Sequence, residues 1–401
     1  MTVKDNAVLI STLYAYWGGV PSMLGFIIRI LEEKGFEPYL ASYMPFGIYP
    51  KLSVPFFALP LGRRPGIKQY LYADKWQATG IGAWFPELEF THYQPTHHWR
   101  DLMERFRYHV LVSGNCLGAW PFVKTGRPFL AWVATSWHED RKDRIRTFPW
   151  HRKLLDTQIN SRFLCRQERA ILRSGSILAL SHYTRRSLEA IAGPGCVADV
   201  MPMPVDLDKF KPDSQQVVAR RIGFTGRFDD PRKNIGLLLE AVALLRNRRP
   251  QVSVDLIGSH PSYELLERIR TLNIESMINI PGPMQQDDLA LSLKSMDLFV
   301  IPSHQEGLCI SGLEALASGC PVISTRCGGP EEFICENHNG LLIDSNPKAL
   351  AAAITRIIDD PSLRKKMAQG ARSSMENNYA YSTQREIFWK AFCLTFPGAV
   401  Q

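Results

Sequence analysis

The feature that most constrains the fold is an alternation of short apolar runs with helical patterns, which occurs twice along the 401 residues. In each half, a run rich in Val, Ile and Leu precedes a stretch whose apolar residues recur three or four positions apart. Such alternation predicts parallel strands joined by helices that cover both faces of a sheet. The proline-rich segment 201–213 has no period and reads as an interdomain linker. We therefore expect an α/β protein with two Rossmann-like, doubly wound parallel-sheet domains.

The expected elements follow from these patterns. In the first half, strands are predicted at 6–13, 37–43, 109–114, 128–135 and 176–181, and helices at 22–35 and 151–175. In the second half, strands are predicted at 220–227, 252–258, 278–282 and 297–303, and helices at 235–247, 262–273, 287–296, 310–318, 347–360 and 362–378. Residues 44–105 show no clean period and receive no assignment. The expected domains are 1–203, with a C-terminal helix 385–401 packing back on it, and 204–384.

Charge and tryptophan are divided unevenly between the halves. Residues 1–205 carry 25 Lys and Arg against 16 Asp and Glu, whereas residues 206–401 carry 22 against 23. Eight of the nine tryptophans also lie in the first half. The two halves are therefore expected to meet different partners.

Composition places the chain among globular proteins, with 45% hydrophobic and 21% charged residues. No apolar run approaches the roughly 20 residues that span a bilayer, and the first residues lack the features of a signal peptide. Eight cysteines without a CxxC pair favour a reducing compartment over a zinc or redox site. We expect a cytoplasmic protein.

Ligands of such sheets bind beyond the carboxyl ends of the strands, so residues that follow strands are the candidates for a site. Glu306 follows a predicted strand, and Glu314 lies in the helix expected from Ile310. The amides and dipole at that helix N-terminus suit a diphosphate. An ionised Glu314 could accept from the two hydroxyls of a ribose, and Glu306 from those of a sugar. The alternative is a capped core helix with two solvated glutamates.

Further candidates follow other strands. Arg227 and Lys233 could hold an anion, although such a pair is also common in solvated loops. His138 follows another strand and could be catalytic or merely structural. Gly18 and Gly19 would let a ligand approach the backbone. The Asp-Asp-Pro sequences at 229–231 and 359–361 are interpreted as turns and caps rather than as metal ligands.

The combination of these features resembles the retaining GT-B glycosyltransferases of family 4. The resemblance lies in the Glu306–Glu314 pair, in "LEALASGCPVIST" and "GGPEEFI" after it, in "GRFDDPRKN" and in the linker "PVDLDKFKP". It covers residues 200–345. In the first half it extends only to Gly18-Gly19, His138 and the strand order.

The resemblance implies two domains facing a central cleft and metal-independent transfer of a glycosyl group with retention. Its implied site residues have distinct roles. Arg227 and Lys233 would hold the donor diphosphate, together with the amides of Leu308, Cys309 and Ile310. Glu314 would bind the ribose and Glu306 the donor sugar. His138 would lie beside the sugar and the acceptor, and Gly18 and Gly19 would line the cleft floor. His138, Arg227, Lys233 and Glu306 form the implied catalytic set. The sequence departs from the family's usual pattern at two positions. It has Cys309 where the family usually has glycine, and Gly312 where proline is common.

We expect transfer of a hexosyl group from a nucleotide-sugar, with a UDP-sugar favoured over GDP-mannose, to a saccharide or lipid-linked acceptor. The nucleotide-sugar is a substrate, and no cofactor, metal or nucleic-acid partner is expected. Alternatives are a GT-B-like nucleotide-sugar epimerase, a non-catalytic glycosyltransferase partner subunit and an NAD-dependent enzyme. The last is disfavoured because no GxGxxG follows the first strand.

The basic half adds one expectation about location. Positive charge at 62–64, 141–146 and 151–153 is interleaved with tryptophans. Such a surface could simply be solvated, or it could meet a phosphorylated acceptor or an anionic membrane. We therefore add peripheral contact with the inner face of a membrane to the expected cytoplasmic location.

Overall fold

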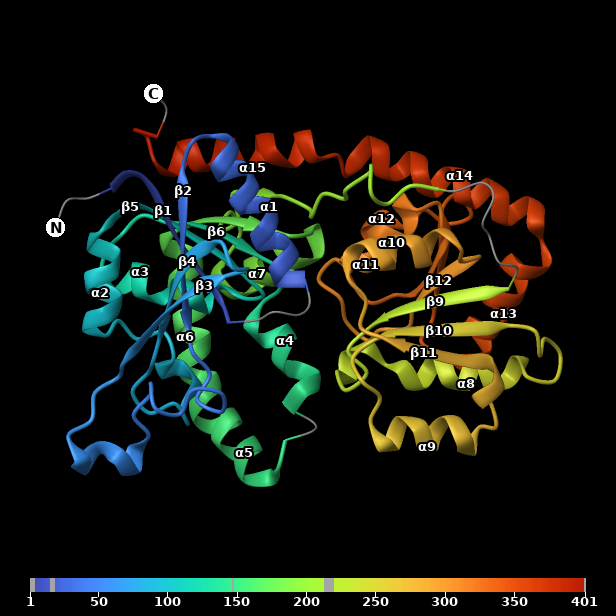
Figure 1. Ribbon diagram of the computed structural model, residues 1–401, viewed down its shortest axis with the longest axis horizontal. Coiled ribbons are helices and arrows are strands. Elements are labelled where there is room, and N and C mark those ends of the chain that lie inside the picture. The colour runs from blue at the N-terminus through green and yellow to red at the C-terminus, as the bar shows by residue number, and fades with distance from the viewer. Residues whose placement is uncertain (1–3, 15–18, 146–147, 213–219, 400–401) are drawn as a thin grey trace. The chain divides into compact units, whose positions relative to one another are not determined.

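The computed structural model describes residues 4–14, 19–145, 148–212 and 220–399. The chain divides into two compact units (Figure 1). Unit 1 comprises residues 1–201 and 385–401, and unit 2 comprises residues 202–384. Each unit has a hydrophobic core of its own.

Within the described residues, unit 1 contains an eight-stranded sheet with the order β3-β4-β2-β1-β5-β6-β7-β8. Its strands are β1 Lys4–Leu13, β2 Glu37–Tyr43, β3 Ile67–Tyr72, β4 Trp76–Ile81, β5 Phe106–Ser113, β6 Leu130–Val133, β7 Ser176–Ala179 and β8 Asp199–Val200. All neighbouring pairs are parallel except β3 and β4. This antiparallel pair lies within residues 44–105, which received no assignment from the sequence, and its two strands are joined by a tight hairpin in which Ala73 and Asp74 take positive φ angles of 48° and 54°.

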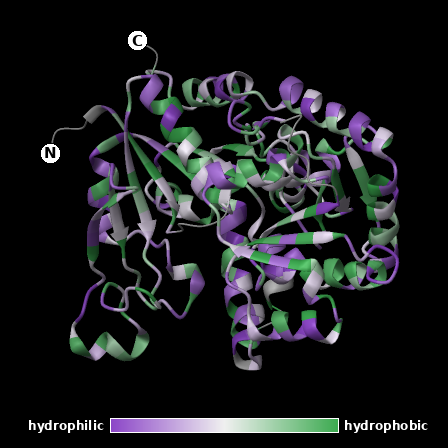
Figure 2. Cartoon of the chain, turned by 45° about the vertical axis from the view of Figure 1, so that its right-hand side comes forward, coloured by the Kyte–Doolittle hydropathy of each residue, from purple (hydrophilic) through white to green (hydrophobic). Residues whose placement is uncertain are grey.

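The helices of unit 1 surround this sheet. They are α1 Gly19–Glu33, α2 His97–Glu104, α3 Trp120–Lys124, α4 Trp137–Arg144, α5 Trp150–Leu155, the π-helical turn η5 Asp156–Asn160, α6 Ser161–Ser174 and α7 His182–Ala192, with short 3-10 helices η1 Phe56–Leu61, η2 Glu89–Thr91 and η3 Cys116–Ala119. The last helix, α15 (Tyr381–Thr395), packs on unit 1, where the ring of Phe392 lies 5.6 Å from the rings of both Phe36 and Tyr108. The colouring in Figure 2 shows η1 as an apolar segment at the opposite end of unit 1 from α15.

Within the described residues, unit 2 contains a six-stranded, fully parallel sheet with the order β11-β10-β9-β12-β13-β14. Its strands are β9 Arg221–Gly226, β10 Ser253–Gly258, β11 Ile278–Gly282, β12 Leu298–Ile301, β13 Val322–Thr325 and β14 Gly340–Ile343. The helices are α8 Ile235–Leu245, α9 Tyr263–Thr271, α10 Gln286–Lys294, α11 Ile310–Ala317, α12 Pro330–Phe333, α13 Pro347–Asp359 and α14 Pro361–Asn378, with short 3-10 helices η6 Pro231–Lys233 and η7 Glu275–Met277.

The strand order of unit 2 positions the candidate site. Strands β9 and β12 are neighbours and parallel, so the segments that follow them meet at one edge of the sheet. The helix α11 begins at the same edge and ends before Gly319, whose φ of 75° is the left-handed conformation common just after a helix C-terminus. In the part of the chain that is described, no helix is both long and apolar enough to cross a bilayer.

Candidate functional site

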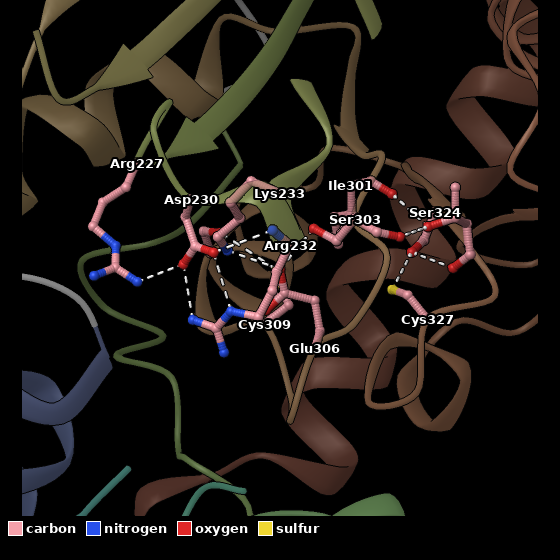
Figure 3. A network of polar contacts seen from close by, with 12 residues as sticks. Arg227, Asp230, Arg232, Lys233, Ile301, Ser303, Glu306, Cys309, Ser324 and Cys327 are labelled. Carbon is pink, nitrogen blue, oxygen red and sulfur yellow. Dashed lines mark hydrogen bonds and ion pairs between the residues drawn. The ribbon is translucent and has the colours of Figure 1, made fainter. Parts of the chain in front are cut away.

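The segment after β9 is organised around the buried carboxylate of Asp230. This carboxylate accepts from Arg227 at 2.5 Å and from Arg232 at 2.8 Å (Figure 3). It also accepts from the backbone amide of Arg232 and so caps η6, which confirms that this aspartate acts as a cap. Burial acts to raise the pKa of Asp230, but the hydrogen bond and charge of Arg232, together with Arg227, outweigh burial and hold that pKa well below its usual range.

Lys233 connects this segment to the loop after β12. Its Nζ donates to Oε1 of Glu306 at 2.8 Å, and Ser303 Oγ donates to the same oxygen at 2.7 Å (Figure 3). Burial acts to lower the pKa of Lys233, but the carboxylate of Glu306 outweighs burial and raises that pKa above its ordinary value. Asn234 stands at the start of α8 with φ 47°, and its side chain donates to Pro302 O at 3.1 Å instead of capping the helix. The segment after β9 and the loop after β12 are thus held together by the Lys233–Glu306 ion pair and by the hydrogen bond from the Asn234 side chain to Pro302 O.

The loop that carries Glu306 is fixed by backbone hydrogen bonds on its other side. The amide of Glu306 donates to Cys327 O at 2.8 Å, and the amide of Gly329 donates to Glu306 O at 2.9 Å. A Cβ atom at Gly329 would lie 2.4 Å from Gly307 O and from the Cα of Leu308. Glycine is therefore required at 329 for these two loops to approach one another.

The N-terminus of α11 faces this loop. Among the described residues, the amides of Leu308, Cys309 and Ile310 donate no hydrogen bond, as is usual at the start of a helix. Cys309 has a φ of 70°, in the left-handed region that favours glycine. Burial raises the pKa of its thiol to about 11, so the side chain stays neutral. A Cβ atom at Gly312 would lie 2.7 Å from Cδ1 of Ile301, so the proline that is common in the family would require the end of that side chain to move.

Glu314 lies one turn into α11 and is 8% exposed. Burial raises the pKa of its carboxyl to about 8, with the charge of Lys209 acting in the opposite direction. The unliganded protein therefore holds Glu314 largely protonated at neutral pH. If Glu314 accepts from both ribose hydroxyls as an ionised carboxylate, it has to lose this proton on binding.

This state leads to a prediction about pH. If ribose hydroxyls donate to the carboxylate, the affinity for UDP should rise with pH up to about 8, because binding below that pH displaces a proton from Glu314. Glu314→Gln should weaken UDP binding and remove this contribution to the pH dependence. Calorimetry with UDP on the wild type and on Glu314→Gln, over pH values up to about 8, isolates the contribution of Glu314, because the titration of UDP itself is the same for both proteins. Equal affinities and parallel pH profiles would make Glu314 an ordinary buried helix residue.

The same group has a second, opposite effect on stability. The unfolded chain ionises Glu314 near its ordinary pKa of 4.5, whereas the folded chain keeps the proton up to about 8. This group therefore lowers the free energy of unfolding as pH rises between those values. A control for Glu314→Gln is accordingly the pH dependence of unfolding, which should become flatter in the variant.

The candidates from the first half lie in unit 1. His138 is the second residue of α4 and lines a pocket with Tyr183 and Arg186. Gly19 begins α1, and Gly18 lies outside the described residues. Glu168, which the sequence patterns did not single out, accepts from the amide of Trp137 at 2.7 Å and so holds the start of α4.

The expected basic cluster 141–146 is partly internal. Arg141 is 13% exposed and forms ion pairs with Glu89 and, at 3.2 Å, with Asp156. The charge of Arg141 is therefore neutralised by ion pairs within unit 1. Arg146 lies outside the described residues.

Over the described residues, no group of three or more His, Cys, Asp or Glu side chains is placed to hold a metal ion. The second Asp-Asp-Pro sequence is also used structurally, since Asp359 pairs with Arg249 and Asp360 caps α14. This agrees with the interpretation of both aspartate pairs as turns and caps.

Lys233, Glu306 and Cys309 are thus brought together in unit 2, whereas Arg227, in the segment that precedes Lys233, pairs with Asp230. The sequence patterns missed the role of Asp230 as the shared partner of two arginines, and that of Ser303. The signal for Asp230 was present, since arginines stand three residues before and two residues after it. Ser303 carried no such signal, because its role depends on the fold of the loop.

Comparison with known proteins gives a family for part of this chain. Residues 210–374 match the family described as Glycosyl transferases group 1. The D-inositol 3-phosphate glycosyltransferase of Arthrobacter sp. (strain FB24) is 30% identical over 43% of this chain and 44% of that protein. The GDP-mannose-dependent alpha-(1-6)-phosphatidylinositol monomannoside mannosyltransferase of Mycolicibacterium smegmatis is 27% identical over 51% of this chain and 58% of that protein. The chain thus spans about half the length of these relatives.

Among solved structures, Anabaena HepE in complex with UDP and glucose is similar with a TM-score of 0.71 and 15% identity, over 97% of this chain and 100% of that chain. At this identity the likeness concerns the fold, and it covers both units. Two parallel-sheet α/β units of this kind constitute the GT-B architecture expected from the sequence. Residues 210–374, which hold the Lys233–Glu306 pair, therefore match the glycosyl transferases group 1 family, and the chain as a whole has the GT-B fold.

Proposed function

We propose that this protein is a retaining glycosyltransferase that moves a hexosyl group from a nucleotide-sugar to a saccharide or lipid-linked acceptor. The observation that carries the proposal is the Lys233–Glu306 pair beside the N-terminus of α11. This arrangement offers a cation and unpaired amides to a diphosphate, and a carboxylate to sugar hydroxyls. The family match over the same residues supports this assignment.

The chemical task of the site is to stabilise charge on the leaving group. When the bond between the anomeric carbon and the diphosphate breaks, its electron pair passes to the diphosphate and the sugar becomes oxocarbenium-like. Lys233 and Arg227 would counter the new negative charge from fixed positions, which is more effective than recruiting solvent during the reaction. Glu306 would hold the sugar hydroxyls, and His138 would lie near the reacting sugar.

A UDP-sugar is the favoured donor and GDP-mannose the second candidate. The first is supported by the fold shared with HepE, which was solved with UDP and glucose, and the second by the name of the Mycolicibacterium relative. Thermal unfolding with a panel of nucleotides tests the proposal, because a ligand of the native state raises the unfolding temperature. UDP or GDP should raise it more than NAD, and an acceptor screen with the matching sugar nucleotide should then give glycosylated product. Release of an epimerised sugar without acceptor would identify an epimerase, and failure of every nucleotide would reject the proposed function.

Metal independence stays a prediction. Turnover should be unchanged by a chelator, because Lys233 and Arg227 take the place that a divalent cation would occupy beside the diphosphate. The measurement is donor turnover in chelator, followed by magnesium or manganese. Loss of turnover in chelator with recovery on adding metal would contradict it.

A further inference from the structure

Unit 1 carries an exposed apolar segment that the sequence patterns did not place. In η1 (Phe56–Leu61), the side chains of Phe56, Phe57 and Leu61 are 72%, 76% and 73% exposed, and that of Leu59 is 41% exposed. These four residues are called the apolar tip below. Figures 1 and 2 show η1 projecting from its own unit, at the lower left, as a predominantly hydrophobic segment. Four large apolar side chains gathered on one projecting turn indicate an interaction surface.

The base of this projection is firmly built. The amide of Val54 donates to Ala83 O at 2.9 Å, and the amide of Phe85 donates to Val54 O at 2.8 Å. A Cβ atom at Gly82 would lie 1.8 Å from Leu52 O, so the two arms of the loop meet backbone to backbone. The apolar tip is therefore held out by its base and does not fold back onto the core.

The surroundings of the tip are basic. Residues 38–73 contain no Asp or Glu. The acid nearest to the tip by hydrogen bonding is Glu87, which accepts from the amide of Phe56 at 3.3 Å. The exposed cations of this stretch are Lys51, Arg63, Arg64 and Lys68.

A second apolar and basic projection lies at the same end of unit 1. On α5, Trp150 is 77% exposed and Leu154 is 56% exposed, and the exposed Arg152 lies between them in the sequence. Figures 1 and 2 both show α5 and η1 reaching the lower end of unit 1, opposite α15. Two projections of the same chemistry at one end indicate a common docking face.

We propose that this end of unit 1 docks on an anionic lipid surface, with the apolar tip inserted among the acyl chains and the surrounding cations on the headgroups. Large apolar side chains with neighbouring cations have the composition of interfacial membrane anchors. A second copy of the chain is a poorer occupant, because matching faces would bring Arg63 and Arg64 against their own like charges. This inference specifies the peripheral location expected from the charge pattern, and it does not depend on glycosyl transfer.

The test uses the full chain and vesicles of phosphatidylcholine with or without phosphatidylglycerol, and no donor is added. Binding to the anionic vesicles is expected at low salt and should weaken as salt rises. Phe56→Ser with Phe57→Ser should lower the partition coefficient by at least about tenfold. Arg63→Gln with Arg64→Gln should lower it by roughly fivefold per charge. The control is Leu394→Ser, since Leu394 is 72% exposed on α15 at the other end of unit 1, and it should bind as the unchanged protein does.

Several outcomes would overturn the proposal. These are equal binding to neutral and anionic vesicles, no binding at low salt, and unchanged binding by the Phe56/Phe57 variant. Sedimentation equilibrium without lipid tests whether a second copy of the chain covers the apolar tip. Self-association that Phe56→Ser with Phe57→Ser abolishes would assign the tip to a second copy. The nucleotide-induced rise in unfolding temperature, measured on every variant, reports separately on folding and on the proposed function.

Discussion

Lys233→Ala is expected to lower donor turnover by about 10²–10³-fold, which is the usual effect of removing one fixed donor that stabilises developing charge. The Nζ of Lys233 lies 2.8 Å from Glu306, and the residue ends η6, two positions before α8 begins. Donor turnover under single-turnover conditions is the measurement. Lys365→Ala, at an exposed position of α14, is the matched control and should leave turnover unchanged.

The ion pair also makes Lys233→Ala a stability variant, which the sequence alone did not indicate. The carboxylate of Glu306 would lose a charged partner while its side chain stays 12% exposed, at a cost of about 1–3 kcal/mol in the free energy of unfolding. Lys233→Ala combined with Glu306→Gln removes the orphaned charge and should restore much of this stability without restoring turnover. If turnover of the single variant stays within a few-fold of the unchanged protein, Lys233 has no part in the reaction.

Gly329→Ala is expected to damage both the fold of the site and its activity. The added Cβ would collide with Gly307 O and the Cα of Leu308, so the Glu306 loop must move away from the loop that begins at Cys327. Overpacking of this kind lowers the free energy of unfolding by about 1–3 kcal/mol. A displacement near 1 Å of groups that position a substrate costs about a hundredfold in rate. Chemical unfolding and donor turnover are the two measurements.

Gly25→Ala is the matched control for this prediction. Gly25 is exposed in α1, and nothing lies within 4 Å of the position its Cβ would take. The same chemical change should therefore raise the free energy of unfolding by about 0.5–1 kcal/mol, since alanine is the better helix former. Equal effects of the two substitutions would show that the contact at Gly329 is not the reason for its sensitivity.

The sequence predicted those parts of the fold whose pattern is local. The run 37–43 became β2 with the same bounds, and α13 and α8 follow their predicted ranges closely, because alternating apolar runs and caps are encoded within a few residues. The predicted helix at 151–175 is instead α5, a π-helical turn and α6 in succession. A widened turn of this kind depends on tertiary packing and has no local signature.

Residues 44–105 could not be assigned for a physical reason. Val54 is paired with Trp84, thirty residues further along the chain, and β3 is short and largely exposed on the sheet edge. Such pairing leaves no period to detect. In the site, the positions of Lys233 and Glu306 could be predicted because each follows a strand. The ion pair between them could not, because it depends on the adjacency of β9 and β12 in space.

The internal pairing of the site has a consequence for selectivity. Lys233 is neutralised by Glu306, and Arg227 shares Asp230 with Arg232, so the resting site already holds its own counter-ions. Under the proposed function, an arriving diphosphate would have to displace Glu306 from Lys233, and the displaced carboxylate would need new hydrogen-bond donors. A sugar attached to the same diphosphate supplies those donors, whereas inorganic phosphate does not. The Lys233–Glu306 pair would therefore favour a ligand that carries both an anion and hydroxyl groups over either fragment alone.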